Sequence, residues 1–227
     1  MSASRSSQVP AEALRSSWRR LFAFLTLCVL LMAILIQQVV SHGPLTGLDR
    51  PTERFAVAHR TGALTAIMRF LSEIGSTSFL VPLILLYITY FVFRERDWRR
   101  PAVLALALVS DILLQDLVKS VIDRNRPPAR FMIGRYPPGS FPSGHTTQSL
   151  VVYGLIALLL IKTQPTWPRI WPLITAATLV LLIGASRIYL GAHWLTDVAG
   201  GLVLGTFWII ILHALFPFLL RDRASSR

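Results

Sequence analysis

The sequence predicts an all-α membrane protein, a bundle of six transmembrane helices with one amphipathic helix at the membrane surface. Of its 227 residues, 53% are hydrophobic and only 15% are charged, and the mean hydropathy is +0.57. Soluble domains carry about 25% charged residues. The charges here gather in short clusters between long apolar runs, which is the pattern of a chain that crosses a bilayer several times.

Six apolar runs are long enough to be transmembrane helices. They cover residues 21–40, 79–93, 102–118, 146–161, 170–185 and 194–215. The bulky residues that close the first run, Gln37-Gln38-Val39-Val40, offer no small-x-small cleavage site, which favours an uncleaved anchor over a signal peptide. Gly201 and Gly205 form a small-xxx-small pair in the last run and predict the close approach of another helix.

The segment 41–73 carries too many charges to cross a membrane. Leu64, Ile67, Met68 and Leu71 nevertheless recur at helical spacing within it. This pattern predicts an amphipathic helix that lies on the membrane surface.

Charge placement predicts the topology of a multi-pass protein of the cell (inner) membrane. Six spans place both ends of the chain on one side, and the positive-inside rule assigns the basic tails 1–20 and 218–227 to the cytoplasm, around a core of residues 21–217. The loops 94–100 and 162–169 would also be cytoplasmic. The loops 119–145 and 187–193 would then share the extracytoplasmic face.

The net charge of +12 would suggest nucleic acid as the partner of a soluble chain. Here the charge is accounted for by the positive-inside rule and by a basic loop, and no nucleic-acid-binding motif is present. The single cysteine, Cys28, excludes an intrachain disulfide and a thiolate zinc cluster.

The loop 119–145 predicts a phosphate site. It contains one acid, Asp123, and several prolines that prevent a continuous helix. It ends in Pro142-Ser143-Gly144-His145, where a helix is expected to begin and to offer backbone N–H groups to an anion. Its five cations are Lys119, Arg124, Arg126, Arg130 and Arg135.

A second polar cluster lies at another break between apolar runs and consists of Ser186-Arg187, His193 and Asp197. Phosphoryl transfer requires cations and N–H donors placed around the phosphate oxygens. One histidine can attack phosphorus while the other protonates the leaving oxygen and later activates water. Asp197 lies four residues after His193, so its carboxylate can accept a hydrogen bond from one ring nitrogen, which fixes the tautomer and leaves the other nitrogen free to attack.

These residues form three motifs that together resemble the type 2 phosphatidic acid phosphatase family, which is related to the vanadium-dependent haloperoxidases. The family pattern is K-x6-RP, then PSGH, then SR-x5-H-x3-D. Lys119 to Arg126-Pro127 matches the first motif, residues 142–145 match the second, and residues 186–197 match the third. All three match without substitution, and the likeness covers residues 21–215.

The resemblance implies a role for each matched residue, with no metal and no cofactor. His193 is expected to be the nucleophile, Asp197 to orient it and His145 to be the acid and base. The phosphate-binding residues would be Lys119, Arg126, Ser143, Gly144 and Arg187. The implied substrate is a membrane lipid phosphate in the bilayer; we rank undecaprenyl pyrophosphate first and diacylglycerol-type phosphates close behind.

Three other functions compete with the phosphatase. A zinc site could use His145, His193 and Asp197, although the neighbouring cations would repel the metal. A lipid or ion transporter or a flippase could use the polar stripe Asp111-Gln115-Lys119, which falls on one face of a single span and is expected to point inward. A catalytically silent lipid-binding relative is disfavoured by the intact pair of histidines.

Several other polar residues have ordinary structural interpretations. Arg124, Arg130 and Arg135 are read as solvated or lipid-facing anchors, and His42 and His59 as surface histidines. His213 lies twenty residues after His193, about 30 Å along a helix, and is expected near the opposite membrane face. Asp111 and Asp116 are expected to pair with Lys119 or Gln115.

Overall fold

The computed structural model describes residues 11–96, 98–163, 168 and 170–216, and its regular elements are helices, with no strand in these ranges. Six helices are long and apolar enough to cross a membrane, so the predicted six-span bundle is confirmed. The six are α1 (Ala11–Val40), α4 (Thr77–Glu95), α5 (Arg99–Ile122), α6 (Gly144–Thr163), α7 (Ile170–Tyr189) and α8 (Leu195–Leu215).

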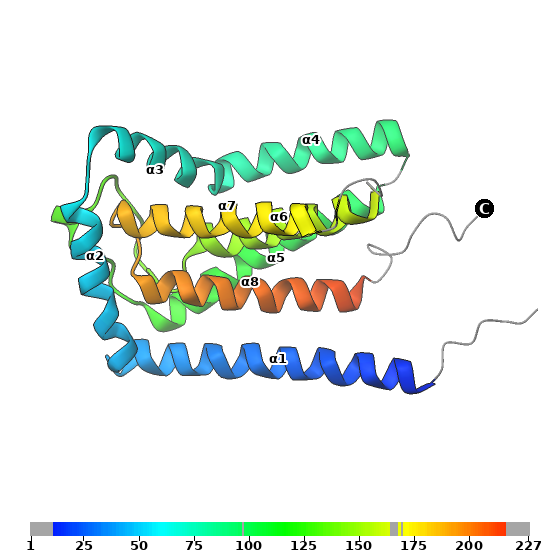
Figure 1. Ribbon diagram of the computed structural model, residues 1–227, viewed down its shortest axis with the longest axis horizontal. Coiled ribbons are helices and arrows are strands. Elements are labelled where there is room, and N and C mark those ends of the chain that lie inside the picture. Colours follow the sequence, from blue (N-terminus) through cyan, green and yellow to red (C-terminus); the bar gives the residue numbers. More distant parts are fainter. Residues whose placement is uncertain (1–10, 97, 164–167, 169, 217–227) are drawn as a thin grey trace, which may run out of the picture.

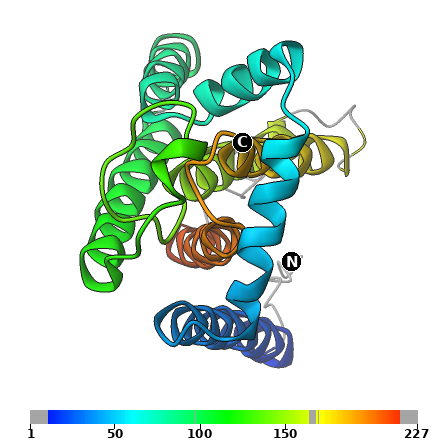
Figure 2. The ribbon, with the colours of Figure 1, turned by 90° about the vertical axis from the view of Figure 1, so that its left-hand side faces the viewer.

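The long helices lie side by side and the short elements gather at one end of the bundle (Figure 1). After α1 the chain forms a short 3-10 helix (Pro44–Leu48), then α2 (Asp49–Ala58), which lies across that end (Figure 2), and α3 (Gly62–Ile74), which packs on α7. The loop between α5 and α6 and the turn between α7 and α8 reach the same end. The beginning of α1 and the end of α8 lie at the opposite end, as six crossings require.

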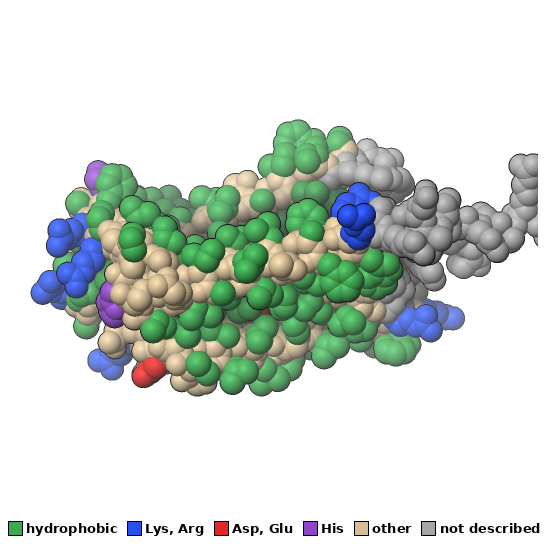
Figure 3. All heavy atoms as spheres, turned by 90° about the horizontal axis from the view of Figure 1, so that it is seen from below, with side chains coloured by type: hydrophobic (Ala, Val, Ile, Leu, Met, Phe, Trp, Pro, Cys, Tyr) green, Lys and Arg blue, Asp and Glu red, His purple; other side chains and the backbone are tan. Residues whose placement is uncertain are grey.

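The outward faces of the helices carry large apolar side chains. Leu113 and Val121 of α5 are 67% and 72% exposed, and Phe93 of α4 is 81% exposed. Figure 3 shows hydrophobic side chains along the whole length of the bundle, with Lys and Arg confined to its two ends. This surface fits the interior of a bilayer and would be costly in water.

Helix α6 lies at the centre, in contact with α4, α5, α7 and α8. Gly201 and Gly205 of α8 face it: a methyl group at Gly201 would lie 2.8 Å from the carbonyl oxygen of Ser143, and one at Gly205 would lie 3.0 Å from Leu150. The predicted close helix contact is therefore the contact between α8 and α6. It sets the distance between the beginnings of these two helices.

Some boundaries differ from the sequence expectation. Helix α1 begins at Ala11, because the stretch up to Arg20 contains good helix formers and follows Pro10. The expected surface helix is α3, which contains all four of the apolar residues that predicted it, and Thr61 caps it by accepting a hydrogen bond from the Leu64 N–H. Helix α2 precedes it as a second, unpredicted helix. Residues 1–10, 97, 164–167, 169 and 217–227, which include much of the expected tails and of the loop 162–169, lie outside the described residues.

Helices α5 and α7 continue past the expected ends of their spans, to Ile122 and Tyr189. Helix α5 ends where Asp123 adopts a left-handed conformation, with φ of 40°. The added turns carry Lys119 of α5 and Arg187 of α7 on regular helix, so that the rigid part of each helix positions the cation.

Candidate active site

The three motifs meet at the end of the bundle where α2 lies. Backbone hydrogen bonds join the loop after α5 to the turn between α7 and α8: the Ser143 N–H donates to the Asp197 carbonyl at 3.0 Å, and the Ile133 N–H to the Leu190 carbonyl at 2.8 Å. The Ser140 N–H donates to the Arg124 carbonyl within the loop, at 2.9 Å. The loop is thus fixed on the residues that precede and begin α8.

His193 is buried at the centre of this arrangement, 3% exposed. Its Nδ1 lies 2.8 Å from the Ser140 carbonyl oxygen and its Nε2 lies 3.3 Å from Nη1 of Arg126. A guanidinium group only donates and a carbonyl only accepts. These two neighbours therefore place the proton on Nδ1 and leave the lone pair of Nε2 directed at Arg126.

Burial lowers the pKa of His193 to about 4, although Asp197 raises it in part; the positive charges of Arg187 and Arg126 lower it further. The imidazole is therefore neutral near pH 7. A neutral ring with its lone pair on Nε2 is the form of histidine that can act as a nucleophile.

Asp197 is fully buried, and its two oxygens have different partners. Oδ2 accepts from the Trp194 N–H at 2.9 Å, at the beginning of α8, and lies 3.4 Å from Nδ1 of His193. Oδ1 accepts from Arg124. The carbonyl of Ser140, a residue outside the three motifs, is thus a closer partner of the His193 ring than Asp197 is.

Arg126 and Arg187 approach the site from two sides. Arg126 donates to the carbonyls of Pro137, Ala192 and Gly139 at 2.6, 2.5 and 3.1 Å, and burial lowers its pKa.

Arg187 is 4% exposed and donates to the hydroxyl of Ser72 on α3. Both guanidinium groups lie over the ring of Tyr136, at 5.6 Å for Arg126 and 4.8 Å for Arg187. The electron-rich face of the ring favours the two positive charges near it.

Lys119 reaches the beginning of α6. Its ammonium nitrogen would lie 3.4 Å from a methyl group at Gly144, and it donates to Gln115 at 3.3 Å and to Asp116 at 3.2 Å. Ser143 is fully buried next to Gly144, and its hydroxyl accepts from Thr146 at 3.0 Å. A side chain at position 144 would collide with Gln115, because its first carbon would overlap Oε1 of Gln115, so the glycine permits the close approach of α5 to the beginning of α6.

His145 follows in the first turn of α6, within electrostatic range of Arg187, His193, Lys119 and Arg126. The end of the bundle therefore holds two histidines, three cations and a helix N-terminus around one point. Such a set can bind a phosphate group and hold a histidine nitrogen towards its phosphorus.

The remaining polar residues divide into surface and interior groups. Arg130, Arg135, His42 and His59 are exposed, as expected of surface residues. Asp111 and Gln115 are buried, at 0% and 1% exposure, so the polar stripe points inward as predicted. Asp116 pairs with Lys119, whereas neither carboxylate oxygen of Asp111 has a hydrogen-bond partner among the described residues.

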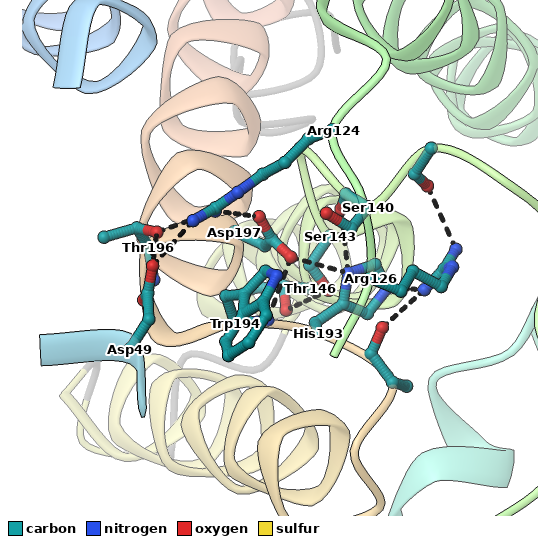
Figure 4. A network of polar contacts seen from close by, with 12 residues as sticks. Asp49, Arg124, Arg126, Ser140, Ser143, Thr146, His193, Trp194, Thr196 and Asp197 are labelled. Atoms are coloured by element: carbon teal, nitrogen blue, oxygen red, sulfur yellow. Dashed lines mark hydrogen bonds and ion pairs between the residues drawn. The ribbon is translucent and has the colours of Figure 1, made fainter. Parts of the chain in front are cut away.

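Arg124 differs from the sequence interpretation. It is not a lipid-facing anchor, because its side chain is only 13% exposed and forms ion pairs with both Asp49 and Asp197 (Figure 4). Asp49, which the sequence analysis did not consider, is 3% exposed. An acid in a charged interfacial segment carries no sequence signal that distinguishes it from its neighbours.

Comparisons with known proteins identify a matching family and several relatives. A model of the PAP2 superfamily matches residues 100–221. The phosphatidylglycerophosphatase B of Bacillus subtilis is 32% identical over 177 residues, which cover 77% of this chain and 86% of the relative. An undecaprenyl-diphosphatase of Sulfolobus acidocaldarius is 31% identical over 159 residues, covering 68% and 71%.

Two solved structures share the fold. A transmembrane PAP2-type phosphatidylglycerolphosphate phosphatase from Bacillus subtilis has a TM-score of 0.80 at 30% identity, covering 88% of this chain and 98% of the other. LpxE of Aquifex aeolicus has a TM-score of 0.56 at 23% identity, covering 74% and 95%; this second likeness concerns the fold alone.

Proposed function

This chain belongs to the PAP2 superfamily and is a multi-pass membrane phosphatase that hydrolyses lipid phosphates, and we propose that it does so through a phosphohistidine formed on His193, at the extracytoplasmic face. The observation that carries the proposal is the state of the His193 ring. Nδ1 faces the Ser140 carbonyl, Nε2 faces Arg126, and the low pKa keeps the ring neutral.

In the first step the lone pair of His193 Nε2 attacks phosphorus and the bond from phosphorus to the lipid oxygen breaks. His145, protonated while the anionic phosphate is bound beside it, gives that proton to the departing oxygen, so the lipid leaves as an alcohol or, from a diphosphate, as a monophosphate. The ring becomes a cationic N-phosphoimidazole that retains its proton on Nδ1, beside the Ser140 carbonyl and the Asp197 carboxylate.

In the second step a water molecule loses a proton to His145 and attacks phosphorus. The bond between phosphorus and Nε2 breaks, inorganic phosphate leaves, and both histidines return to their starting states. Through both steps Lys119, Arg126 and Arg187, together with the Ser143 hydroxyl and the Gly144 N–H, compensate the charge on the phosphate oxygens. The protein's own groups thus supply every proton transfer, and we propose that no metal takes part.

The placement of charges supports the extracytoplasmic face. Arg19 and Arg20 lie in the first part of α1, at the end of the bundle away from the site, and the basic residues around the junction of α4 and α5, Arg94, Arg96 and Arg99, lie at the same end. The positive-inside rule assigns that end to the cytoplasm. We accordingly place both termini, with the expected tails 1–20 and 218–227, in the cytoplasm and the core 21–217 in the cell membrane.

The substrate we propose is a lipid that delivers its phosphate at headgroup depth, since Lys119 and Gly144 lie at helix ends. The relatives act on phosphatidylglycerophosphate or on undecaprenyl diphosphate, by their names. The similarity to the phosphatidylglycerophosphatase covers 77% of this chain, against 68% for the undecaprenyl-diphosphatase. The solved structure with a TM-score of 0.80 is also a phosphatidylglycerolphosphate phosphatase. This supports a glycerophospholipid phosphate ahead of the isoprenoid diphosphate, which reverses the order expected from the sequence.

The test measures phosphate release by purified protein in mixed detergent micelles. The substrates are phosphatidylglycerophosphate, phosphatidic acid, undecaprenyl diphosphate and p-nitrophenyl phosphate, and His193→Ala is compared with His59→Ala, a surface histidine. We expect release from the lipids, with the highest kcat/KM for phosphatidylglycerophosphate, and no turnover in His193→Ala. A transporter would release no phosphate in micelles, and a preference for p-nitrophenyl phosphate would contradict a lipid substrate.

A further inference from the structure

Helix α2 brings a buried acid to the beginning of α8. Asp49 is the first residue of α2 and is 3% exposed. Its Oδ1 accepts from the N–H of Thr196 at 2.9 Å and from its hydroxyl at 3.1 Å, and its Oδ2 lies 2.8 Å from the same hydroxyl. A carboxylate at a helix N-terminus satisfies N–H groups that have no partner within the helix.

Arg124 joins this acid to Asp197. Its Nη2 donates to Oδ2 of Asp49 at 2.6 Å, while its Nη1 donates to the Thr196 hydroxyl at 2.8 Å and to Oδ1 of Asp197. Figure 4 shows the guanidinium group between the two carboxylates, with Thr196 beside it. Only the planar fork of an arginine can donate in these directions at once.

The ion pair determines how Asp197 faces the nucleophile. With Oδ1 bound to Arg124 and Oδ2 bound to the Trp194 N–H, the carboxylate has one orientation, and in it Oδ2 lies 3.4 Å from His193 Nδ1. Without Arg124, Oδ1 would lose its partner, the carboxylate would be held by the Trp194 N–H alone, and its buried charge would lose the cation with which it is paired.

We propose that Arg124, held in place by Asp49, is a positioning residue for His193 that acts through Asp197. This inference rests on the proposed role of His193 as the nucleophile. It also gives α2 a function: the helix lies across the end of the bundle and closes the network around the beginning of α8, from an element outside the three sequence motifs.

The positive charge of Arg124 should also influence the pKa of His193. The charged and titratable groups around His193 are Asp197 from α8, Arg126 from the loop after α5, Arg187 from α7 and His145 from α6. Asp197 raises the pKa of His193, and the positive charge of Arg124 opposes the negative charge of Asp197. Removing the charge of Arg124 should therefore raise the pKa of His193. In the pH profile of kcat/KM, the fall in activity on the acidic side (the acidic limb) should then begin at a higher pH.

Two substitutions at Arg124 distinguish the effect of its hydrogen-bonding geometry from the effect of its positive charge. Arg124→Gln removes both the fork and the charge, so kcat should fall about 100-fold, as for a misplaced reacting group, and the acidic limb should move to higher pH. Arg124→Lys keeps the charge but loses the fork, so kcat should fall while the acidic limb stays in place. KM should change less than about threefold in both, because neither variant touches the bound phosphate.

Asp49→Asn and Thr196→Val test the outer part of the network with milder changes. Asp49→Asn weakens the contacts of residue 49 with Arg124 and Thr196, and Thr196→Val removes the hydroxyl that contacts Arg124 and Asp49. Each should lower kcat about tenfold, as for an outer partner of a catalytic group. Arg135→Gln is the matched control, an exposed arginine of the same loop, and should behave like the unchanged protein. All kcat values are divided by the active-site concentration from the phosphoenzyme burst, so loss of folded protein does not mimic loss of function.

The outcomes distinguish the inference from the function on which it rests. If His193→Ala keeps its activity, the proposed nucleophile is wrong. If His193→Ala is inactive while the soluble, active-site-titrated variants of Arg124, Asp49 and Thr196 match Arg135→Gln in kcat and pH profile, the positioning role is wrong. Should both Arg124 variants fail to fold, normal kcat in Asp49→Asn and Thr196→Val would equally overturn it.

Discussion

Replacing Asp197 with asparagine tests how the site stabilises the phosphorylated histidine. When Nε2 of His193 bonds to phosphorus, the ring gains a positive charge and keeps its proton on Nδ1, which lies 3.4 Å from Oδ2 of Asp197. Two unit charges at this distance attract by about 5 kcal/mol at an effective dielectric constant of about 20. Arg124 binds the other carboxylate oxygen and should offset roughly half of that attraction at similar range.

The remaining 2–3 kcal/mol corresponds to a loss of about 100-fold in kcat, at about 1.4 kcal/mol for each factor of ten. The loss stays finite because the Ser140 carbonyl, 2.8 Å from Nδ1, still holds the ring in the reactive tautomer. Asp197 raises the pKa of His193, so Asp197→Asn should lower that pKa further below about 4. This shift is opposite in sign to the one expected for Arg124→Gln.

The assay is single-turnover and steady-state phosphate release in detergent, with a titration of the histidine ring by nitrogen NMR in the free enzyme. Asp123→Asn is the matched control, because Asp123 is exposed on the same face and adopts a left-handed conformation that asparagine also accepts. A kcat for Asp197→Asn within about twofold of the control would refute the electrostatic argument. A rise in the His193 pKa would refute it too.

Three further predictions concern packing, topology and metal dependence. Gly201→Ala should destabilise the protein by about 1–3 kcal/mol, seen as a lower unfolding temperature, because the added methyl would lie 2.8 Å from the Ser143 carbonyl; unchanged stability would show that α8 can move away from α6. In a Cys28→Ser background, the Arg135→Cys variant should react with an impermeant thiol reagent on intact cells, and the Trp98→Cys variant should not. The reverse pattern would place the site in the cytoplasm. Excess EDTA should leave phosphate release unchanged, and a loss restored by added zinc would favour the metal-site alternative.

The sequence predicted the convergence of distant motifs because their chemistry is carried by side chains with fixed spacing. Lys119, Arg187 and His193 lie near helix ends that the apolar pattern placed at one membrane depth, and the structure brings them together. The inward orientation of Asp111 and Gln115 followed from the cost of exposing polar groups to lipid. These features depend on period and hydropathy, which a sequence displays directly.

The contacts that were missed have no such signature. The Ser140 oxygen that faces His193 belongs to the backbone, so no residue type signals it. Asp49 meets Thr196 across 147 positions of the chain, and its segment reads as an ordinary charged surface region. Arg124 was misread because an arginine near a helix end is usually an anchor, and only its two buried acid partners identify it as part of the site.

The phosphohistidine itself is the most direct test of the mechanism. Enzyme mixed with a lipid labelled in its terminal phosphate is quenched in alkali, where phosphohistidine survives, and digested for mapping by mass spectrometry. We predict label on His193, none in His193→Ala, and accumulation of label in His145→Ala with a substrate whose leaving group needs no proton. Label on His145, or full turnover by His193→Ala, would contradict the assignment of the nucleophile.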